Sequence, residues 1–262
     1  MKIGVFDSGF GGLTVLRALL ERIPKADYIY LGDTARLPYG AKSRATVARY
    51  AASSARFLVA QGAEFLVIAC NTASALALDA IRDAVSVPVL GVVETGANAA
   101  QATSVTRDVL VIATAATVES HAYAAACAER RLRAIEKACP LLVPLVEEGW
   151  IEHPVTNEVL RIYMSELLTQ AVDAGLNADT LVLGCTHYPL LRAQIECAVP
   201  KRWHVIDSAA VTAEQVAGTL HAEGGAGRTQ FFATDSVAKF RALGGRFLGQ
   251  PIAAVDLVDL GG

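Results

Sequence analysis

The chain has 262 residues, 53% hydrophobic and 19% charged, so it can form one large domain or two ordinary ones and is too apolar for intrinsic disorder. Its net charge is −3, and no run of Lys or Arg is long enough to follow a phosphate backbone, so a nucleic-acid partner is not expected. The apolar stretches are much shorter than the about 20 residues that a membrane-spanning helix needs.

Short apolar runs alternate along the chain with longer stretches of helical periodicity. Strands are predicted at residues 3–6, 28–31, 65–69, 89–93, 109–113, 180–183, 204–206 and 231–233. Helices are predicted between them, for example before Pro24 and before Gly62, and a loop is expected at residues 224–227. The alternation predicts an α/β fold with mainly parallel sheets flanked by helices.

Polar or reactive side chains follow nearly every predicted strand. In chain order they are Asp7-Ser8, Asp33, Cys70-Asn71-Thr72, Glu94, Thr114, Cys185-Thr186-His187 and Asp207-Ser208. Ligands of open α/β sheets bind at the carboxyl ends of the strands, so we expect the functional site there.

Two of the predicted strands resemble copies of one unit, because each is an apolar run that ends in Cys and two hydrogen-bonding residues. One copy carries Cys70 and the other Cys185, and each is preceded by a further strand with a polar end. We therefore predict two pseudo-symmetric lobes with the active site in the cleft between them. The first lobe is expected to contain residues 1–96 and 208–262, and the second residues 97–207.

The cysteines divide into two groups. Three of the five are expected to be small buried side chains: Cys127, Cys139 and Cys197. Cys70 and Cys185 differ, because each stands at the expected start of a helix, where backbone amides lower the pKa of a thiol. Asp7 and His187 are the natural acid–base partners of these two thiols, and Cys185 is expected to react faster with alkylating agents than Cys70.

The cysteine count and the first residues also bear on the compartment. Five cysteines are an odd number, none is in a C-x-x-C motif, and no secretory signal is recognisable. We therefore expect reduced thiols and a cytoplasmic location, with no membrane association.

Two segments of the sequence have features of cofactor sites. Zinc has three possible ligands here, namely Cys70, Cys185 and His187. No pair of metal ligands with the spacing of a zinc finger appears elsewhere in the sequence, so no metal is expected. Residues 9–14 imitate a dinucleotide-binding loop, but Thr14 stands where the third glycine is required. These glycines either permit a tight turn or contact a ligand through their amides.

The combined motifs resemble those of the glutamate racemase family. The matching segments are Gly4-Val5-Phe6-Asp7-Ser8-Gly9, Gly32-Asp33-Thr34, Pro38-Tyr39-Gly40, Ala69-Cys70-Asn71-Thr72-Ala73, Val146-Glu147 and Gly184-Cys185-Thr186-His187-Tyr188-Pro189. Their order and spacing fit from residue 3 to about residue 207, whereas the last fifty or so residues carry no matching motif.

The resemblance implies an enzyme without a cofactor that interconverts L- and D-glutamate and supplies D-glutamate for bacterial peptidoglycan. It implies that Cys70 and Cys185 exchange protons with opposite faces of Cα, assisted by Asp7, His187 and Glu147. The residues expected to bind the substrate are Asp7, Ser8, Pro38, Tyr39, Gly40, Asn71, Thr72, Thr114, Thr117, Thr186 and His187. Which donor holds which carboxylate stays open, and the oligomeric state stays open between a monomer and a homodimer.

Four alternatives compete with this interpretation. A racemase for aspartate or another amino acid would share the fold, and a decarboxylase of this fold would keep only one cysteine. A pyridoxal phosphate racemase needs a Schiff-base lysine, and only Lys42 lies near a site motif. A non-catalytic amino-acid-binding protein would have a two-lobed cleft but would not need paired thiols.

Overall fold

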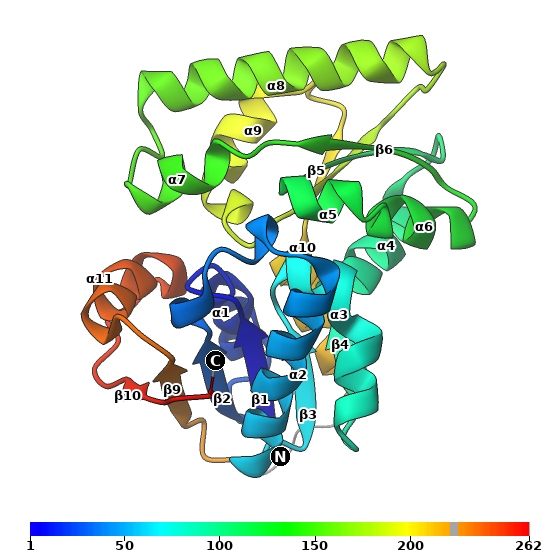
Figure 1. Cartoon of the computed structure of the whole chain (residues 1–262). Helices are drawn as coiled ribbons and strands as arrows, with labels where there is room; N and C mark the ends of the chain where they lie inside the picture. Colours follow the sequence, from blue (N-terminus) through cyan, green and yellow to red (C-terminus); the bar gives the residue numbers. More distant parts are fainter. Residues whose placement is uncertain (221–224, 262) are drawn as a thin grey trace.

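The computed structural model describes residues 1–220 and 225–261 and contains two parallel sheets with helices around them (Figure 1). The first sheet has the strand order β10-β9-β2-β1-β3-β4 and the second β6-β5-β7-β8. Every paired strand runs parallel to its neighbour. We call each sheet with the helices that cover it a lobe, and the predicted α/β class is confirmed.

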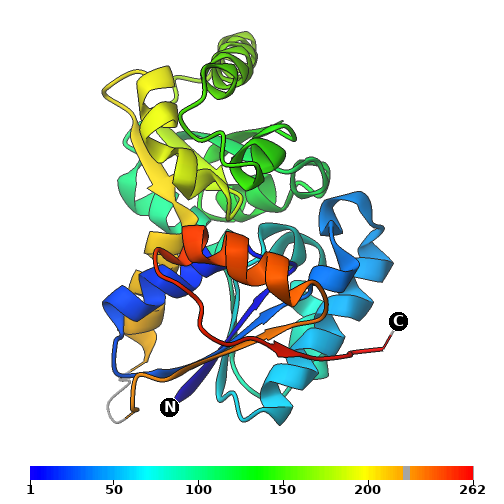
Figure 2. The same ribbon diagram turned by 90° about the vertical axis from the view of Figure 1, so that its left-hand side faces the viewer.

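The first lobe combines the beginning and the end of the chain. Its strands are β1 (Lys2–Asp7), β2 (Asp27–Gly32), β3 (Phe65–Ile68), β4 (Val89–Gly91), β9 (Thr229–Ala233) and β10 (Asp256–Leu257). Its helices are α1 (Leu13–Arg22), α2 (Arg44–Ala60), α3 (Asn71–Ala84) and α11 (Val237–Leu248), with short 3₁₀ turns η1 (Thr34–Arg36) and η2 (Tyr39–Ala41). Figure 2 shows α11 on the side of this lobe that faces the second one.

The second lobe is formed by the middle of the chain. Its strands are β5 (Asp108–Ala113), β6 (Arg133–Ala138), β7 (Thr180–Gly184) and β8 (His204–Asp207). Its helices are α5 (Ala115–Glu119), α6 (Ala122–Glu129), α7 (Leu142–Glu147), α8 (Pro154–Asp173) and α9 (Arg192–Ala198), with the 3₁₀ turn η3 (Tyr188–Leu191). Helices α4 (Val92–Thr103) and α10 (Ser208–Thr219) pack against each other where the two lobes meet.

The strand orders reveal the internal repeat that the cysteine strands suggested. The series β2-β1-β3-β4 in the first sheet corresponds, position by position, to β6-β5-β7-β8 in the second. Strand β3, which precedes Cys70, therefore has β7, which precedes Cys185, as its counterpart. The exact lobe boundaries at residues 96/97 and 207/208 remain a prediction.

All eight predicted strands are present, and the structure adds two. Strand β6 is an edge strand in which the charged residues Arg133, Glu136 and Lys137 interrupt the apolar ones, and none of its side chains is fully buried. Strand β10 has only two residues, both exposed, and lies at the edge of the first sheet beside β9. Neither has the continuous apolar run on which the prediction relied.

Two expectations about segment ends need adjustment. The strand predicted at 89–93 ends at Gly91, and Val92 begins α4. The loop expected at 224–227 lies partly outside the described residues, but residues 225–227 are irregular. Within residues 1–220 and 225–261, no helix combines the length and the apolar character that crossing a membrane requires.

Candidate active site

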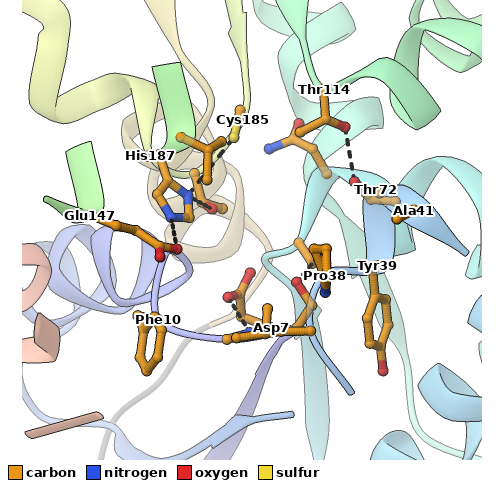
Figure 3. A pocket seen from close by; sticks show the side chains of 18 of the residues that line it. Asp7, Phe10, Pro38, Tyr39, Ala41, Thr72, Thr114, Glu147, Cys185 and His187 are labelled. Carbon is orange, nitrogen blue, oxygen red and sulfur yellow. Dashed lines mark hydrogen bonds and ion pairs between the residues drawn. The ribbon is translucent and has the colours of Figure 1, made fainter. Parts of the chain in front are cut away.

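A cavity of about 510 Å³ lies at the carboxyl ends of β1, β3, β5 and β7, so both lobes contribute to its wall. Figure 3 shows side chains from both lobes pointing into it. Its lining residues are Asp7, Ser8, Gly9, Phe10, Leu37, Pro38, Tyr39, Gly40, Ala41, Cys70, Asn71, Thr72, Thr114, Ala115, Pro140, Val143, Pro144, Glu147, Cys185, Thr186, His187 and Lys239. The two cysteine motifs, far apart in the sequence, thus share one cavity.

The structure gathers the predicted site residues at this cavity, with one exception. Thr117 does not line the cavity, because it is fully buried behind Thr72 and Thr114. The three hydroxyl oxygens form a cluster, with 2.9 Å between Thr114 and Thr117 and 3.1 Å between Thr72 and Thr114. Thr117 therefore supports two lining hydroxyls and does not offer its own to a ligand.

Tyr39 lines the cavity, but its hydroxyl points away from it (Figure 3). The phenol donates to Asp33 Oδ2 at 2.6 Å, and Asp33 also accepts from Thr234 at 2.9 Å. A ligand can therefore be contacted by the ring and the backbone at Tyr39, while the buried carboxylate of Asp33 holds the segment in place.

Cys70 is the N-cap residue of α3, as expected for a thiol at a helix start. Its Sγ accepts from the Ala73 amide at 3.4 Å and lies 3.3 Å from Ser8 Oγ. Burial and the negative charge of Asp7 nevertheless raise the pKa of Cys70 to about 12. The expected lowering of this pKa is therefore wrong, because the desolvation of a thiolate outweighs the hydrogen bonds that favour it.

Cys185 has a different environment, dominated by an imidazole. Its Sγ lies 3.9 Å from His187 Nδ1, and His187 Nε2 lies 3.2 Å from Glu147 Oε1 (Figure 3). No α-helix begins at Cys185, contrary to expectation: the chain bends there and forms only the short η3 turn from Tyr188. The charge that assists this thiol therefore comes from a side chain and not from a helix N-terminus.

The His187–Glu147 pair is partly buried and mutually stabilising. Burial disfavours a charged imidazole, but the hydrogen bonds to Cys185 and Glu147 outweigh it and raise the pKa of His187 to about 10. The hydrogen bond from His187 lowers the pKa of Glu147. The imidazole therefore carries a positive charge at neutral pH and donates from both nitrogens.

This charge state gives a prediction that NMR can test. A raised His187 pKa means that the imidazole stays protonated as the pH rises through its usual value of 6.5 and loses its proton only near pH 10. Glu147→Gln removes the carboxylate, so we expect the pKa of His187 to fall in that variant. A pH titration of the imidazole resonances measures both values; a midpoint near 6.5 in the unmodified protein would contradict this assignment.

Asp7 sits at the end of β1 on the same side of the cavity as Cys70. Its Oδ2 accepts from the Gly9 amide at 2.8 Å, and the side chain is 2% exposed. Burial raises the pKa of Asp7, although backbone hydrogen bonds and the charge of His187 oppose this rise. A carboxyl group with a raised pKa can both accept and return a proton near Cys70.

Several lining residues were missed from the sequence. Most are apolar and belong to segments without a polar motif: Phe10, Leu37, Ala41, Pro140, Val143 and Pro144. Lys239 was missed because it lies on α11, in the C-terminal segment that matched no motif, and reaches the cavity only through the return of the chain to the first lobe. Arg246 of the same helix donates to the backbone oxygens of Val146 and Glu147, so α11 joins the two lobes beside the site.

One expectation about the other cysteines is wrong. Cys127 and Cys139 are fully buried, as predicted, but Cys197 is exposed on α9. The expectation for Cys197 rested only on the general tendency of cysteines to be buried, and α9 turns this side chain to solvent. Among the described residues, no group of three His, Cys, Asp or Glu side chains is arranged to hold a metal ion.

These environments predict the order in which the thiols are alkylated. At neutral pH we expect Cys185 and the exposed Cys197 to react before Cys70, because the pKa of Cys70 is about 12. The rate at Cys70 should rise with pH, and glutamate should protect Cys70 and Cys185 but leave Cys197 unaffected. Peptide mapping by mass spectrometry over a time course measures all five rates; equal labelling of all five, with or without glutamate, would refute the assignment.

Comparisons with known proteins agree with one another. The family model for Asp/Glu/hydantoin racemases matches residues 3–216. A glutamate racemase from Koribacter versatilis is 52% identical over 99% of this chain and 98% of that protein.

Solved structures give the same result. The glutamate racemase of Francisella tularensis in complex with D-glutamate matches with a TM-score of 0.89 and 34% identity, over 99% of this chain and 97% of that one. The glutamate racemase of Thermus thermophilus in complex with β-chloro-D-alanine matches with a TM-score of 0.86 and 45% identity, over 99% and 97%. An aspartate racemase from Picrophilus torridus, 17% identical with a TM-score of 0.55, shares the fold alone.

Proposed function

The chain belongs to the Asp/Glu/hydantoin racemase family, and we propose that it interconverts L- and D-glutamate by moving protons through two cysteine thiols, without a cofactor. The observation that carries this proposal is the position of Cys70 and Cys185, which come from equivalent strands of the two lobes and line one cavity. The likeness to aspartate racemases is confined to the fold, so glutamate is favoured as the substrate.

Inversion at Cα requires a base on one face of the carbon and an acid on the other. In one direction the thiolate of Cys185 removes the proton from Cα: the C–H bond breaks and an S–H bond forms. The thiol of Cys70 then delivers its proton to the opposite face of Cα and becomes a thiolate. The opposite direction uses the same groups with their roles exchanged. In each turnover one cysteine gains a proton and the other loses one.

The surroundings of the two thiols support the role of Cys70 as the acid in this direction. The high pKa of Cys70 keeps it as a thiol, ready to act as the acid. His187 Nδ1 lies 3.9 Å from Cys185 Sγ, so the imidazole is placed to exchange a proton with this thiol. Asp7, on the same side of the cavity as Cys70, can exchange protons near that thiol. Glu147 holds His187 through a hydrogen bond.

Neutral donors at the cavity suit a substrate with two carboxylates. The lining hydroxyl and amide groups belong to Ser8, Asn71, Thr72, Thr114 and Thr186. The Nδ2 atom of Asn71 is buried and has no hydrogen-bond partner among the described residues, so it is a donor that a carboxylate would satisfy. Donors near Cα would also stabilise the negative charge that develops when the proton leaves.

The proposal is tested by incubating the purified protein with L-glutamate, with no pyridoxal phosphate and no metal added. We expect D-glutamate to accumulate until the two enantiomers are equal, as measured by chiral chromatography. Racemisation that is abolished by a chelator, or that requires pyridoxal phosphate, would refute the mechanism without a cofactor. The supply of D-glutamate for peptidoglycan follows as the proposed role. Sedimentation velocity distinguishes a monomer from a homodimer.

A further inference from the structure

A buried tyrosine connects the two cysteine motifs from behind the cavity. Tyr123 lies on α6 of the second lobe and is fully buried. Its hydroxyl donates to Oδ1 of Asn71 at 2.7 Å, and Asn71 is the first residue of α3 in the first lobe, next to Cys70. The hydrogen bond therefore crosses from one lobe to the other.

The ring of Tyr123 fits between two glycines. A Cβ atom at Gly184 would lie 2.9 Å from Cε2 of the ring, and a Cβ atom at Gly96 would lie 3.1 Å from Cε1. Both distances are shorter than ordinary contacts, so the absence of side chains at these positions lets the ring approach the backbone. Gly184 directly precedes Cys185, so Tyr123 touches the neighbour of each thiol.

This contact fixes the orientation of the Asn71 amide. The hydroxyl of Tyr123 has one proton, and among the described residues its only hydrogen-bond acceptor is Oδ1 of Asn71. If the amide were reversed, Nδ2 would occupy that place and the buried tyrosine proton would lose its acceptor, which is costly. Burial also raises the pKa of Tyr123, so it remains a proton donor.

The other end of the amide is then left without a partner. Asn71 is 3% exposed and lines the cavity, and its Nδ2 has no partner among the described residues. An amide whose oxygen accepts a hydrogen bond is polarised and becomes a stronger donor through its nitrogen.

We propose that Tyr123 is a positioning residue, which holds the Asn71 amide so that Nδ2 donates to a carboxylate of the bound amino acid. This inference rests on the proposed function, because it takes the ligand of the cavity to be glutamate. Tyr123 does not touch the substrate itself and acts only through Asn71.

Tyr123→Phe tests the proposal, since it removes the hydroxyl and keeps the ring between the two glycines. A hydrogen bond to a charged carboxylate would be weakened, so we expect KM to rise about 10- to 100-fold for both enantiomers. The contact with a carboxylate exists in both the ground state and the transition state, so kcat should change less than about threefold.

The decisive control is the same change in a protein that lacks the amide. In an Asn71→Ala background, Tyr123→Phe should change KM less than about twofold, because the residue through which it acts is gone. If Asn71→Ala is too slow for kinetics, dissociation constants for glutamate from titration calorimetry give the same ratio. Tyr28→Phe is the matched control for stability: it removes another buried hydroxyl, which contacts the backbone oxygens of Leu19 and Ile23, and should leave KM unchanged.

The outcomes separate the inference from the proposed function. A KM change below about threefold in Tyr123→Phe, or an equal change with and without Asn71, would overturn the inference while racemisation by the unmodified protein stands. Failure of the unmodified protein to racemise glutamate would overturn the proposed function and the inference with it.

Discussion

Replacing either Cys70 or Cys185 by alanine is expected to lower kcat for glutamate racemisation by about 10²- to 10⁴-fold, in both directions. Each thiol serves one face of Cα, and inversion needs both faces, so neither cysteine can compensate for the loss of the other. The two effects should not multiply in the double variant, because the first loss already removes the mechanism.

The fold should survive these substitutions. Both side chains are 5% exposed, and alanine fills most of the space of a cysteine, so a loss of only about 1 kcal/mol of stability is expected. Circular dichroism and thermal unfolding check this point. Cys127→Ala is the matched control, since it removes a buried thiol that does not line the cavity, and it should keep nearly full activity. A Cys70→Ala or Cys185→Ala variant with near-normal turnover would rule out the two-thiol mechanism.

Glutamate is expected to be preferred over aspartate by about 10³-fold or more in kcat/KM. Aspartate is one methylene shorter, so its two carboxylates cannot reach donors that are held for glutamate on rigid elements of two lobes. A buried donor such as Asn71 Nδ2 would then stay unpaired, and such losses are much larger than the loss of one methylene contact. Chiral chromatography with each amino acid measures the ratio.

Alanine is the control for the distal carboxylate, because it lacks that group entirely. We expect no racemisation of alanine above the rate measured without enzyme. A kcat/KM for aspartate within tenfold of the value for glutamate would show that the cavity does not discriminate between substrates by the distance between their carboxylates. The assignment of the donors would then be wrong.

Periodicity and strand-end residues were sufficient to predict the sheets and the position of the site. Continuous apolar strands are covered on both faces, so their sequences are distinctive, and the residues after them must meet at one edge of the sheet. Strand β6 was missed because an edge strand interrupted by charged residues, such as Glu136 and Lys137, resembles a surface loop or helix. The internal repeat would have predicted this strand, because β6 corresponds to β2 of the first sheet.

The electrostatics of the site were harder to predict, because they depend on burial. A helix start was expected to lower the pKa of Cys70, but the depth of the thiol and the charge of Asp7 reverse the direction. The role of Glu147 came only from a family resemblance, and the structure supplies its physical partner, His187. Tyr123 carried no signal at all, since an aromatic residue in an alanine-rich helix is indistinguishable from an ordinary core residue.

The central claim, that two different thiols handle the two faces of Cα, is tested most directly with L-glutamate in D₂O. Thiol protons exchange with solvent, so the thiol that delivers its proton carries deuterium. At low conversion we expect the D-glutamate formed to contain one deuteron at Cα, while the recovered L-glutamate keeps its proton. Mass spectrometry after chiral separation measures both. D-glutamate that retains the original proton, or deuterium that enters L-glutamate as fast as D-glutamate appears, would show that one group serves both faces and would contradict the account.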